Sequence, residues 1–359
     1  MNLPRRHHAA TPRFYLDRWA GPDDQVCLMR LIRGDVKSRR YHPQNTGWIS
    51  DLYRTHGVPE AQSQNFETQF LAPLDAKASL ALAKLVTNQT LDIEERRQWT
   101  RFLLSQLFRT RETVTLIKSH MADICREAII ASEDEWARLR KPEEKRSLVE
   151  AMAGDRQLAL SETRAEKMMR QIISEHRAEP DIMAMHWTCV DLRRSKTPLL
   201  TSDRPIVFLS LSEPDSYIAL PLGPYHLFVA AFDDRFEKQF PTTDPSKVAW
   251  AMNRDVVSQA REFVWGLDDA DIDFVRTYIG SAPDRVILSA TQREEALAAA
   301  RLGPVQGRRP LRPMAVVGTH FVIAPLAGVR ARPRKLLAFL LAFFKIAQKY
   351  ANKIRSMSL

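Results

Sequence analysis

Gln106 and Arg109 are the polar residues whose spacing says most about possible chemistry. Gln106 follows Trp99 by seven residues, on the apolar stripe of a predicted helix, and Arg109 comes one turn later at the edge of that stripe. A buried amide or guanidinium left without hydrogen bonds costs on the order of 1–3 kcal/mol or more. The pair could bind an anionic or planar ligand, because arginine holds carboxylate or phosphate bidentately. The alternative, which is the commoner role of buried polar groups, is that both hold the N-terminal segment through its backbone carbonyls.

Glu67 is a second candidate, because it lies on the core side of its predicted helix in line with Phe70 and Leu71. A carboxylate in that position is either paired or has a raised pKa, as catalytic acids often have. The competing interpretation is a structural ion pair with an arginine such as Arg109.

Asp203 and His8 complete the set of candidates. Asp203 follows the apolar residues Leu199 and Leu200 and precedes Arg204 and Pro205, which suits either an active-site acid at a strand end or an ordinary turn. His8 could serve as a base or a metal ligand, although a histidine so near the N-terminus is more often exposed.

His8, Glu67 and Asp203 are the residue types of a divalent-metal hydrolase, but their spacing does not show that they meet. Two other motifs are weaker evidence for a functional site. The six-residue spacing of Arg170 and His176 arises easily by chance, and His176 extends an apolar helical stripe. His186 and Cys189 would lie on opposite faces of a strand. The sequence has no Gly-rich phosphate loop, nucleophile elbow or Walker lysine.

The elements that position these residues change character along the chain. Residues 1–60 are irregular, with short extended runs such as 26–32. Helical periodicity then predicts helices from residue 67 with a bend at Pro73, from a capping box at Asp92 and Glu95, over 114–139, and over 143–176 with a weak point at Gly154. Helices therefore fill the N-terminal half.

After Pro180 the apolar period becomes two, which predicts strands over 183–190, 199–202, 206–211, 217–222 and 226–232. A helix over 245–260, a strand over 263–265 and a helix over 268–278 follow. Helices first and strands later predict an α+β fold with a mostly antiparallel sheet rather than alternating α/β.

The charge is divided unevenly along the chain. Residues 301–359 hold twelve of the 53 cations and no Asp or Glu, so residues 1–300 keep 41 cations against 43 acids. The net charge of +10 therefore belongs to the tail, and nucleic-acid binding is not supported for the body by this balance. Three widely spaced cysteines and no apolar leader predict a cytoplasmic protein.

The tail contains a predicted basic amphipathic helix. Lys345, Lys349 and Lys353 share one face and Ile346, Tyr350 and other apolar residues share the opposite one. Residues 335–355 could therefore bind an anionic membrane surface, at the inner face of the membrane, or a protein partner. The alternative is that the apolar side docks on the body. We expect a single domain over 1–280, a connecting helix or linker over 281–300, and the basic tail over 301–359.

The chain resembles the bacterial family known as domain of unknown function 4238 over roughly residues 6–280. The resemblance rests on motifs in a fixed order: the histidines before residues 12–16, then Asp51, Leu52 and Tyr53, Glu67, Gln106 with Arg109 and Thr110, Trp187, residues 201–205, Pro221 with Leu222, and Phe263 with Val264. Here His8 precedes Pro12 by four residues where the family has three, and Arg111 and Arg204 replace a usual proline and asparagine. The resemblance implies a fold and a set of positions, and no activity.

These observations lead to two hypotheses. The first is a hydrolase acting on a phosphate-containing or nucleic-acid substrate, in which Arg109 holds the anion, Glu67 or Asp203 binds metal or acts as base, and His8 assists. The second is a non-enzymatic ligand-sensing or interaction module whose basic tail binds a membrane or a partner. Neither requires a specific cofactor, and the sequence identifies none.

Overall fold

The computed structural model describes residues 7–176, 178–208, 216–283 and 294. Helices dominate the N-terminal half and antiparallel strands follow, so the predicted α+β class is confirmed. The tail helix and nearly all of the proposed linker lie outside the described residues. Among the described helices, none is long and apolar enough to cross a membrane.

The N-terminal segment consists of short strands and turns. β1 (His7–Ala9) pairs with β4 (Trp48–Ser50), and β2 (Val26–Ile32) forms a hairpin with β3 (Asp35–Tyr41). The one-turn helix α1 (Arg13–Leu16) lies between β1 and β2 along the chain. The sequence predicted β2 but not the other strands, because β3 is a largely charged and polar segment with no apolar alternation.

The first long helix begins as a wide π-type turn over Phe66–Leu71 and continues as α2 (Ala72–Val86). The bonding pattern changes from π-type to α-helical just before Pro73, the residue at which the sequence predicts a bend and which has no N–H to donate. The next helix, α3 (Ile93–Phe108), starts with the predicted capping box. Asp92 accepts hydrogen bonds from the backbone of residues 94 and 95, and the Glu95 side chain accepts one from the Asp92 N–H.

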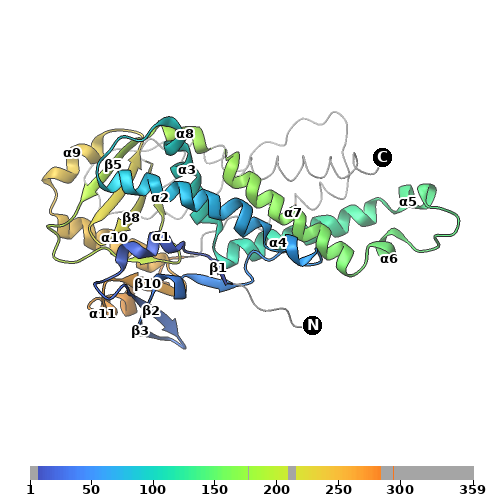
Figure 1. Cartoon of the computed structure of the whole chain (residues 1–359), viewed down its shortest axis with the longest axis horizontal. Coiled ribbons are helices and arrows are strands. Elements are labelled where there is room, and N and C mark those ends of the chain that lie inside the picture. The colour runs from blue at the N-terminus through green and yellow to red at the C-terminus, as the bar shows by residue number, and fades with distance from the viewer. Residues whose placement is uncertain (1–6, 177, 209–215, 284–293, 295–359) are drawn as a thin grey trace.

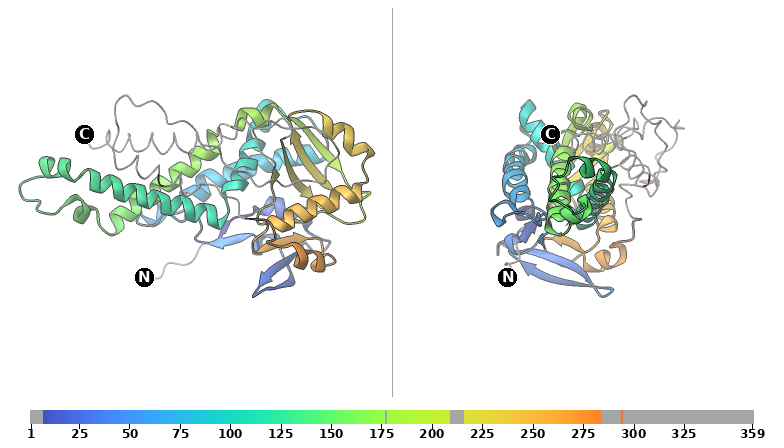
Figure 2. Two further views of the ribbon diagram at one scale, coloured as in Figure 1. Left: turned by 180° about the vertical axis from the view of Figure 1, so that it is seen from behind. Right: turned by 90° about the vertical axis from the view of Figure 1, so that its right-hand side faces the viewer.

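Four helices form an arm that projects beyond the rest of the molecule (Figures 1 and 2). They are α4 (Arg111–Ala131), α5 (Glu133–Leu139), α6 (Leu148–Met152) and α7 (Asp155–Ser174). The predicted helix over 114–139 is divided at Ser132. Gly154, with a φ of 70°, separates α6 from α7 at the predicted weak point.

Two four-stranded antiparallel sheets contain all the described strands other than β1 and β4, including the hairpin of β2 and β3. The first has the order β3-β2-β10-β6, with β10 (Phe263–Gly266) and β6 (Thr201–Ser202). The second has the order β5-β9-β8-β7, whose bounds are β5 (His186–Asp191), β9 (His226–Ala231), β8 (Tyr217–Gly223) and β7 (Val207–Phe208).

The strand predicted to begin at Met183 starts later. Met183 and Ala184 end a short helix, α8 (Ala178–Ala184), and β5 begins at His186. Pro180 falls in the first turn of α8, where the missing N–H has no intrahelical partner in any case. The strand pattern expected directly after Pro180 therefore begins only after one further short helix.

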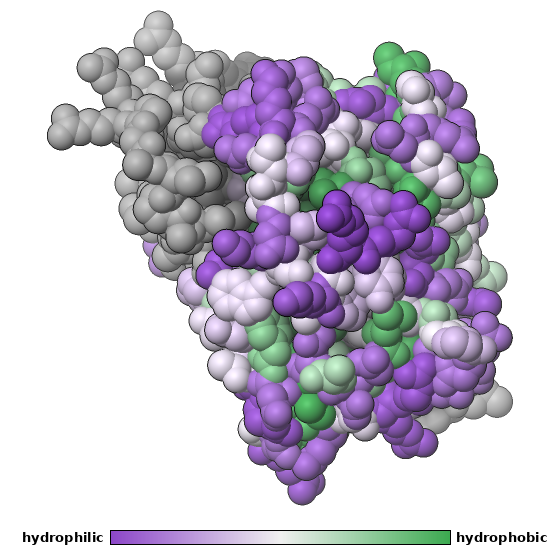
Figure 3. Space-filling view, turned by 90° about the vertical axis from the view of Figure 1, so that its left-hand side faces the viewer, coloured by the Kyte–Doolittle hydropathy of each residue, from purple (hydrophilic) through white to green (hydrophobic). Residues whose placement is uncertain are grey.

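The second sheet is buried on both faces, which explains its continuous apolar strands. Phe228 and Ala230 face a core shared with α2 and α3, whereas Leu227 and Val229 face α10 (Pro245–Gln259). The remaining helices are α9 (Arg235–Gln239) and α11 (Ile272–Tyr278). On the side of the molecule seen in Figure 3, apolar residues form small separate spots on a mainly hydrophilic surface.

Gly57 sets how closely the N-terminal segment approaches α7. Its φ is +73°, and a Cβ there would lie 2.6 Å from the Asp155 carbonyl oxygen and 2.8 Å from the Ala159 nitrogen. We expect Gly57→Ala to destabilise the protein by about 2 kcal/mol, through backbone strain and this overlap. Thermal unfolding measures the loss. Gly34→Ala is the matched control, because Gly34 has a φ of +85° and no atom within 4 Å. An equal loss in both variants would show that the contact with α7 contributes nothing.

Candidate functional site

The end of α3 places Gln106 and Arg109 in the interior, where they are 5% and 2% exposed. Arg109 makes two parallel hydrogen bonds to Asp75 of α2, with N···O distances of 2.9 and 2.6 Å. This bidentate pair occupies both terminal nitrogens of the guanidinium. The bonding capacity that the sequence suggested for an external anion is thus largely used by an internal carboxylate.

Glu67, in the π-type turn, has one carboxylate oxygen engaged and one free. Its Oε1 accepts a hydrogen bond from the backbone N–H of Ala9 at 3.4 Å, whereas Oε2 is buried and has no hydrogen-bond partner among the described residues. Burial raises the pKa of Glu67 to about 7, and the positive charge of Arg109 only partly opposes this. In the described part of the chain, Arg109 pairs with Asp75 and makes no ion pair with Glu67.

Tyr53 connects Glu67 and Arg109 to the N-terminal strands. Its hydroxyl donates weakly to the carbonyl oxygens of Ala9 and Arg109, at 3.5 and 3.4 Å. Burial raises the pKa of Tyr53 well above its ordinary value, so the hydroxyl stays protonated and remains a donor. The ring meets the Phe66 ring edge-on, at a centroid distance of 5.2 Å. Tyr53 therefore contacts both Ala9, whose N–H bonds Glu67, and Arg109, whose charge acts on Glu67.

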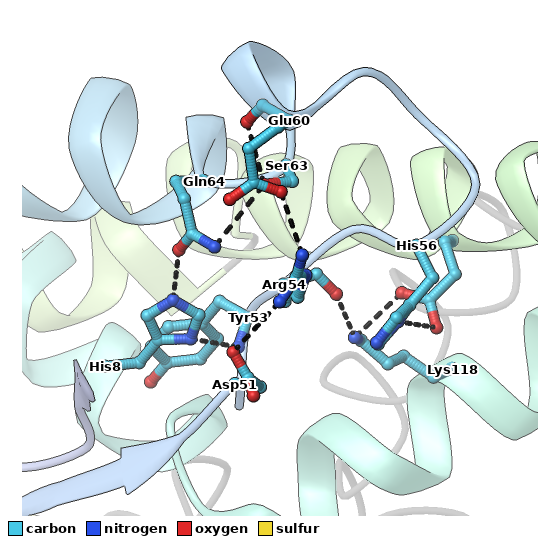
Figure 4. Close-up of polar contacts among 10 residues, drawn as sticks. His8, Asp51, Tyr53, Arg54, His56, Glu60, Ser63, Gln64 and Lys118 are labelled. Atoms are coloured by element: carbon cyan, nitrogen blue, oxygen red, sulfur yellow. Dashed lines mark hydrogen bonds and ion pairs between the residues drawn. The ribbon is translucent and has the colours of Figure 1, made fainter. Parts of the chain in front are cut away.

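His8 lies on the other side of Tyr53, and only 1% of it is exposed (Figure 4). Its Nδ1 accepts a hydrogen bond from the Tyr53 backbone N–H at 2.7 Å, and its Nε2 donates to the side-chain oxygen of Gln64. One ring nitrogen accepts and the other donates, which fixes the neutral tautomer. Burial lowers the pKa of His8, which also favours the neutral form. His8 is therefore not the exposed terminal histidine that was the alternative.

A charged network that begins at Arg54, the residue after Tyr53, extends to the arm (Figure 4). Arg54 bonds Glu60 at 2.8 Å, and its carbonyl oxygen accepts from Lys118 of α4 at 2.8 Å. Lys118 also pairs with Glu162 of α7 at 2.8 Å, and Glu162 lies 3.4 Å from His56. These contacts tie the segment after β4 to both long helices of the arm.

Asp203 stabilises a different part of the fold. Its carboxylate accepts hydrogen bonds from three consecutive backbone N–H groups, those of Arg261, Glu262 and Phe263, at 3.0, 2.8 and 3.3 Å. Burial raises the pKa of Asp203 to about 6, and the three N–H groups partly oppose the shift. These bonds hold the turn between α10 and β10, which is a structural role but one exerted on a segment far along the chain and not on the turn at Arg204 and Pro205.

The structure brings some candidates together and leaves one apart. Glu67 and Arg109 interact electrostatically, Gln106 lies one turn before Arg109 on α3, and His8 reaches them through Tyr53. In the described chain, no hydrogen bond or ion pair joins Asp203 to these residues, and no three His, Cys, Asp or Glu residues are grouped to hold a metal ion.

Sequence reasoning missed two residues of this site, Asp75 and Tyr53. Asp75 carried a signal, because it follows Glu67 by eight residues and therefore lies on the same helical face. For Tyr53 the only signal in the sequence is its place in the motif formed by Asp51, Leu52 and Tyr53.

Three buried polar atoms in this region have no hydrogen-bond partner among the described residues: Glu67 Oε2, Gln106 Nε2 and Arg109 Nε. The two nitrogens can donate to an oxygen of a bound group. A carboxylate whose pKa is about 7 can either give or take a proton near neutral pH. These two donors and one carboxylate oxygen are the polar atoms of this region that the described chain leaves without a hydrogen bond.

No curated protein and no solved structure matches this chain. The pattern of the family described as "Protein of unknown function (DUF4238)" matches residues 6–270, and the chain belongs to that family.

Proposed function

We propose that the protein is a hydrolase in which Glu67 transfers the proton and the substrate is phosphate-containing, nucleic acids included. The observation that supports this is the buried Oε2 of Glu67, which has no hydrogen-bond partner in the described chain and belongs to a carboxyl of pKa about 7. A general acid or base works best when its pKa lies near the operating pH. Glu67 as a residue is only partly buried, so solvent reaches the side of the helix that carries it.

In this proposal Gln106 Nε2 and Arg109 Nε donate hydrogen bonds to one phosphate oxygen. Asp75 keeps the guanidinium oriented, because it holds both terminal nitrogens. Protonated Glu67 gives its proton to the leaving oxygen, or ionised Glu67 takes one from the attacking water. His8 acts indirectly, because both ring nitrogens are engaged and it positions the backbone of Tyr53.

The test is turnover of chromogenic phosphomonoesters and phosphodiesters by the full chain, with and without divalent metal ions. We expect Glu67→Gln to lower kcat by about 100-fold or more with little change in KM, since proton transfer contributes about 10²–10⁴-fold. The wild-type rate should also show a titration near pH 7 that the variant lacks. The control is Glu237→Gln, in the exposed helix α9. Full activity of Glu67→Gln would overturn the proposed role.

The alternative is a non-enzymatic ligand-sensing module, and one observation favours it. His8, Arg109 and Asp203 each spend most of their hydrogen-bonding capacity on other parts of the chain. Stabilisation by a phosphate-containing ligand without turnover, lost on Gln106→Leu, would support a sensor over an enzyme. In both cases we propose that the basic residues 335–355 attach the protein to an anionic membrane surface or a partner. Co-sedimentation of the full chain with anionic but not neutral vesicles tests the membrane version.

A further inference from the structure

The sheet β3-β2-β10-β6 has one face that is only half covered. The opposite face packs through Met29, Val36 and Val264 against residues of α10 and α11. The register places Phe263 opposite Arg30 and Arg30 opposite Lys37, so these side chains share the other face. By the same register, Leu28 with Arg39 and Val26 with Tyr41 also lie on it.

This face divides into a covered half and an open half. Val26, Leu28 and Trp265 are buried in the main core. Beyond them, the side chains of Arg30 and Lys37 are 46% and 66% exposed. We define the open sheet face as Arg30, Ile32, Lys37 and Arg39, the turn residue Arg33, and the two half-buried rings at its border, Tyr41 and Phe263, which also pack against the main core.

Two half-buried aromatic rings on the open sheet face already interact with arginines. The Arg30 guanidinium carbon lies 5.0 Å from the centre of the Phe263 ring, and that of Arg39 lies 5.2 Å from the centre of the Tyr41 ring. Such contacts hold a planar cationic group over each ring, and other planar groups can stack on arginine and aromatic side chains.

The open sheet face is locally basic although the body as a whole is slightly acidic. Within the described residues, Arg33 and Arg39 have no acidic partner. Arg30 pairs with Glu262, and Lys37 pairs with Asp35 at 2.5 Å, but Asp35 is shared with Arg276. Four cations therefore face two acids, one of which is engaged twice.

We propose that the open sheet face binds single-stranded nucleic acid. Arg33, Lys37 and Arg39 contact the phosphates, and bases stack on Phe263, Tyr41 or the guanidinium groups over them. A sheet that combines cations with aromatic rings fits single strands, because the bases of a duplex are not free to stack on protein. The charge balance over residues 1–300 does not reveal this surface, because it averages the sheet with the acidic remainder.

The test is fluorescence anisotropy of the full chain with a labelled single-stranded RNA of about twelve nucleotides, a usual site size for such surfaces. The twelve tail cations also attract RNA, so only variants of the full chain with an identical tail are compared, at the same salt concentration. The variants are Arg39→Glu, which reverses an unpaired cation, and Phe263→Leu, which keeps the site apolar. Lys247→Glu makes the same charge change at an exposed residue of α10.

We expect Arg39→Glu and Phe263→Leu each to weaken RNA binding by about tenfold, and Lys247→Glu to leave it within about twofold. Arg39→Glu should also weaken the binding of long-chain inorganic polyphosphate, whereas Phe263→Leu should not, because polyphosphate has no bases to stack on the ring. The proposal is overturned if both sheet variants bind RNA as Lys247→Glu does, if Phe263→Leu weakens polyphosphate as much as RNA, or if duplex RNA of the same length binds more tightly. Unchanged thermal unfolding of Arg39→Glu excludes a folding defect.

Discussion

Asp75→Ala is expected to destabilise the protein by about 3–5 kcal/mol, the usual cost of removing one partner of a buried ion pair. The variant leaves the guanidinium of Arg109, which is only 2% exposed, without the carboxylate that binds both of its terminal nitrogens. The loss should be largest near pH 5.5, where Glu67 is protonated and cannot replace Asp75. At pH 8, ionised Glu67 can accept the released guanidinium, and part of the stability returns.

Urea and thermal unfolding at both pH values measure this effect. The matched control is Asp17→Ala, which removes a partner of Arg13 at 3.6 Å in a pair whose side chains are 66% and 46% exposed. An exposed pair of this kind is worth about 0–1 kcal/mol. The double variant Asp75→Leu with Arg109→Met should recover much of the loss, because no unpaired charge remains. A loss below about 1 kcal/mol in Asp75→Ala would mean that solvent reaches Arg109 and that the pair is not a buried anchor.

The partner of Arg109 shows where sequence reasoning stops. The apolar stripe of α3 places Gln106 and Arg109 toward the interior, and both are buried. Periodicity within one helix says which side chains point inward, but not which residues of another helix they meet. Asp75 and Glu67 lie on the same helix face, and only the packing of α2 against α3 decides that Asp75 receives the guanidinium.

The fold was predictable where side-chain burial repeats with a regular period. The capping box at Asp92 and the apolar strands β8 and β9 follow from local chemistry and from burial on both faces. β3 could not be predicted in this way, because it pairs with β2 through backbone groups while presenting mostly charged side chains. α8 was misassigned because Met183 and Met185 alternate over too few residues to distinguish a strand from the end of a short helix.

His8 illustrates a second limit. Its position near the N-terminus favours exposure, yet the pairing of β1 with β4 carries it beneath Tyr53 and Gln64. That pairing joins residues about forty positions apart through backbone hydrogen bonds, so no side-chain pattern in the sequence announces it. The motif shared with the family marks the position but not its role.

Glu67→Gln is expected to change how stability depends on pH. Between the ordinary carboxyl pKa of 4.5 and the folded value of about 7, the folded chain holds a proton that the unfolded chain releases. Unfolding free energy therefore falls as pH rises through this window and levels off above it. The difference between wild type and Glu67→Gln should change by roughly 3 kcal/mol between pH 4 and pH 8.5, with the variant gaining relative stability as the pH rises.

The comparison isolates Glu67 from the other shifted acid. The pKa of Asp203 is raised to about 6, so its deprotonation lowers the stability of the wild type and of Glu67→Gln equally as the pH rises. This contribution therefore cancels in the difference between the two proteins. Urea unfolding of wild type, Glu67→Gln and the control Glu237→Gln at half-unit pH steps gives the three curves, and only Glu67→Gln should diverge from the wild type. Parallel curves would show that the carboxyl of Glu67 titrates like an exposed one. The proposed acid–base role would then lose its physical basis, because an ordinary carboxyl is almost fully ionised at neutral pH and has no proton to donate.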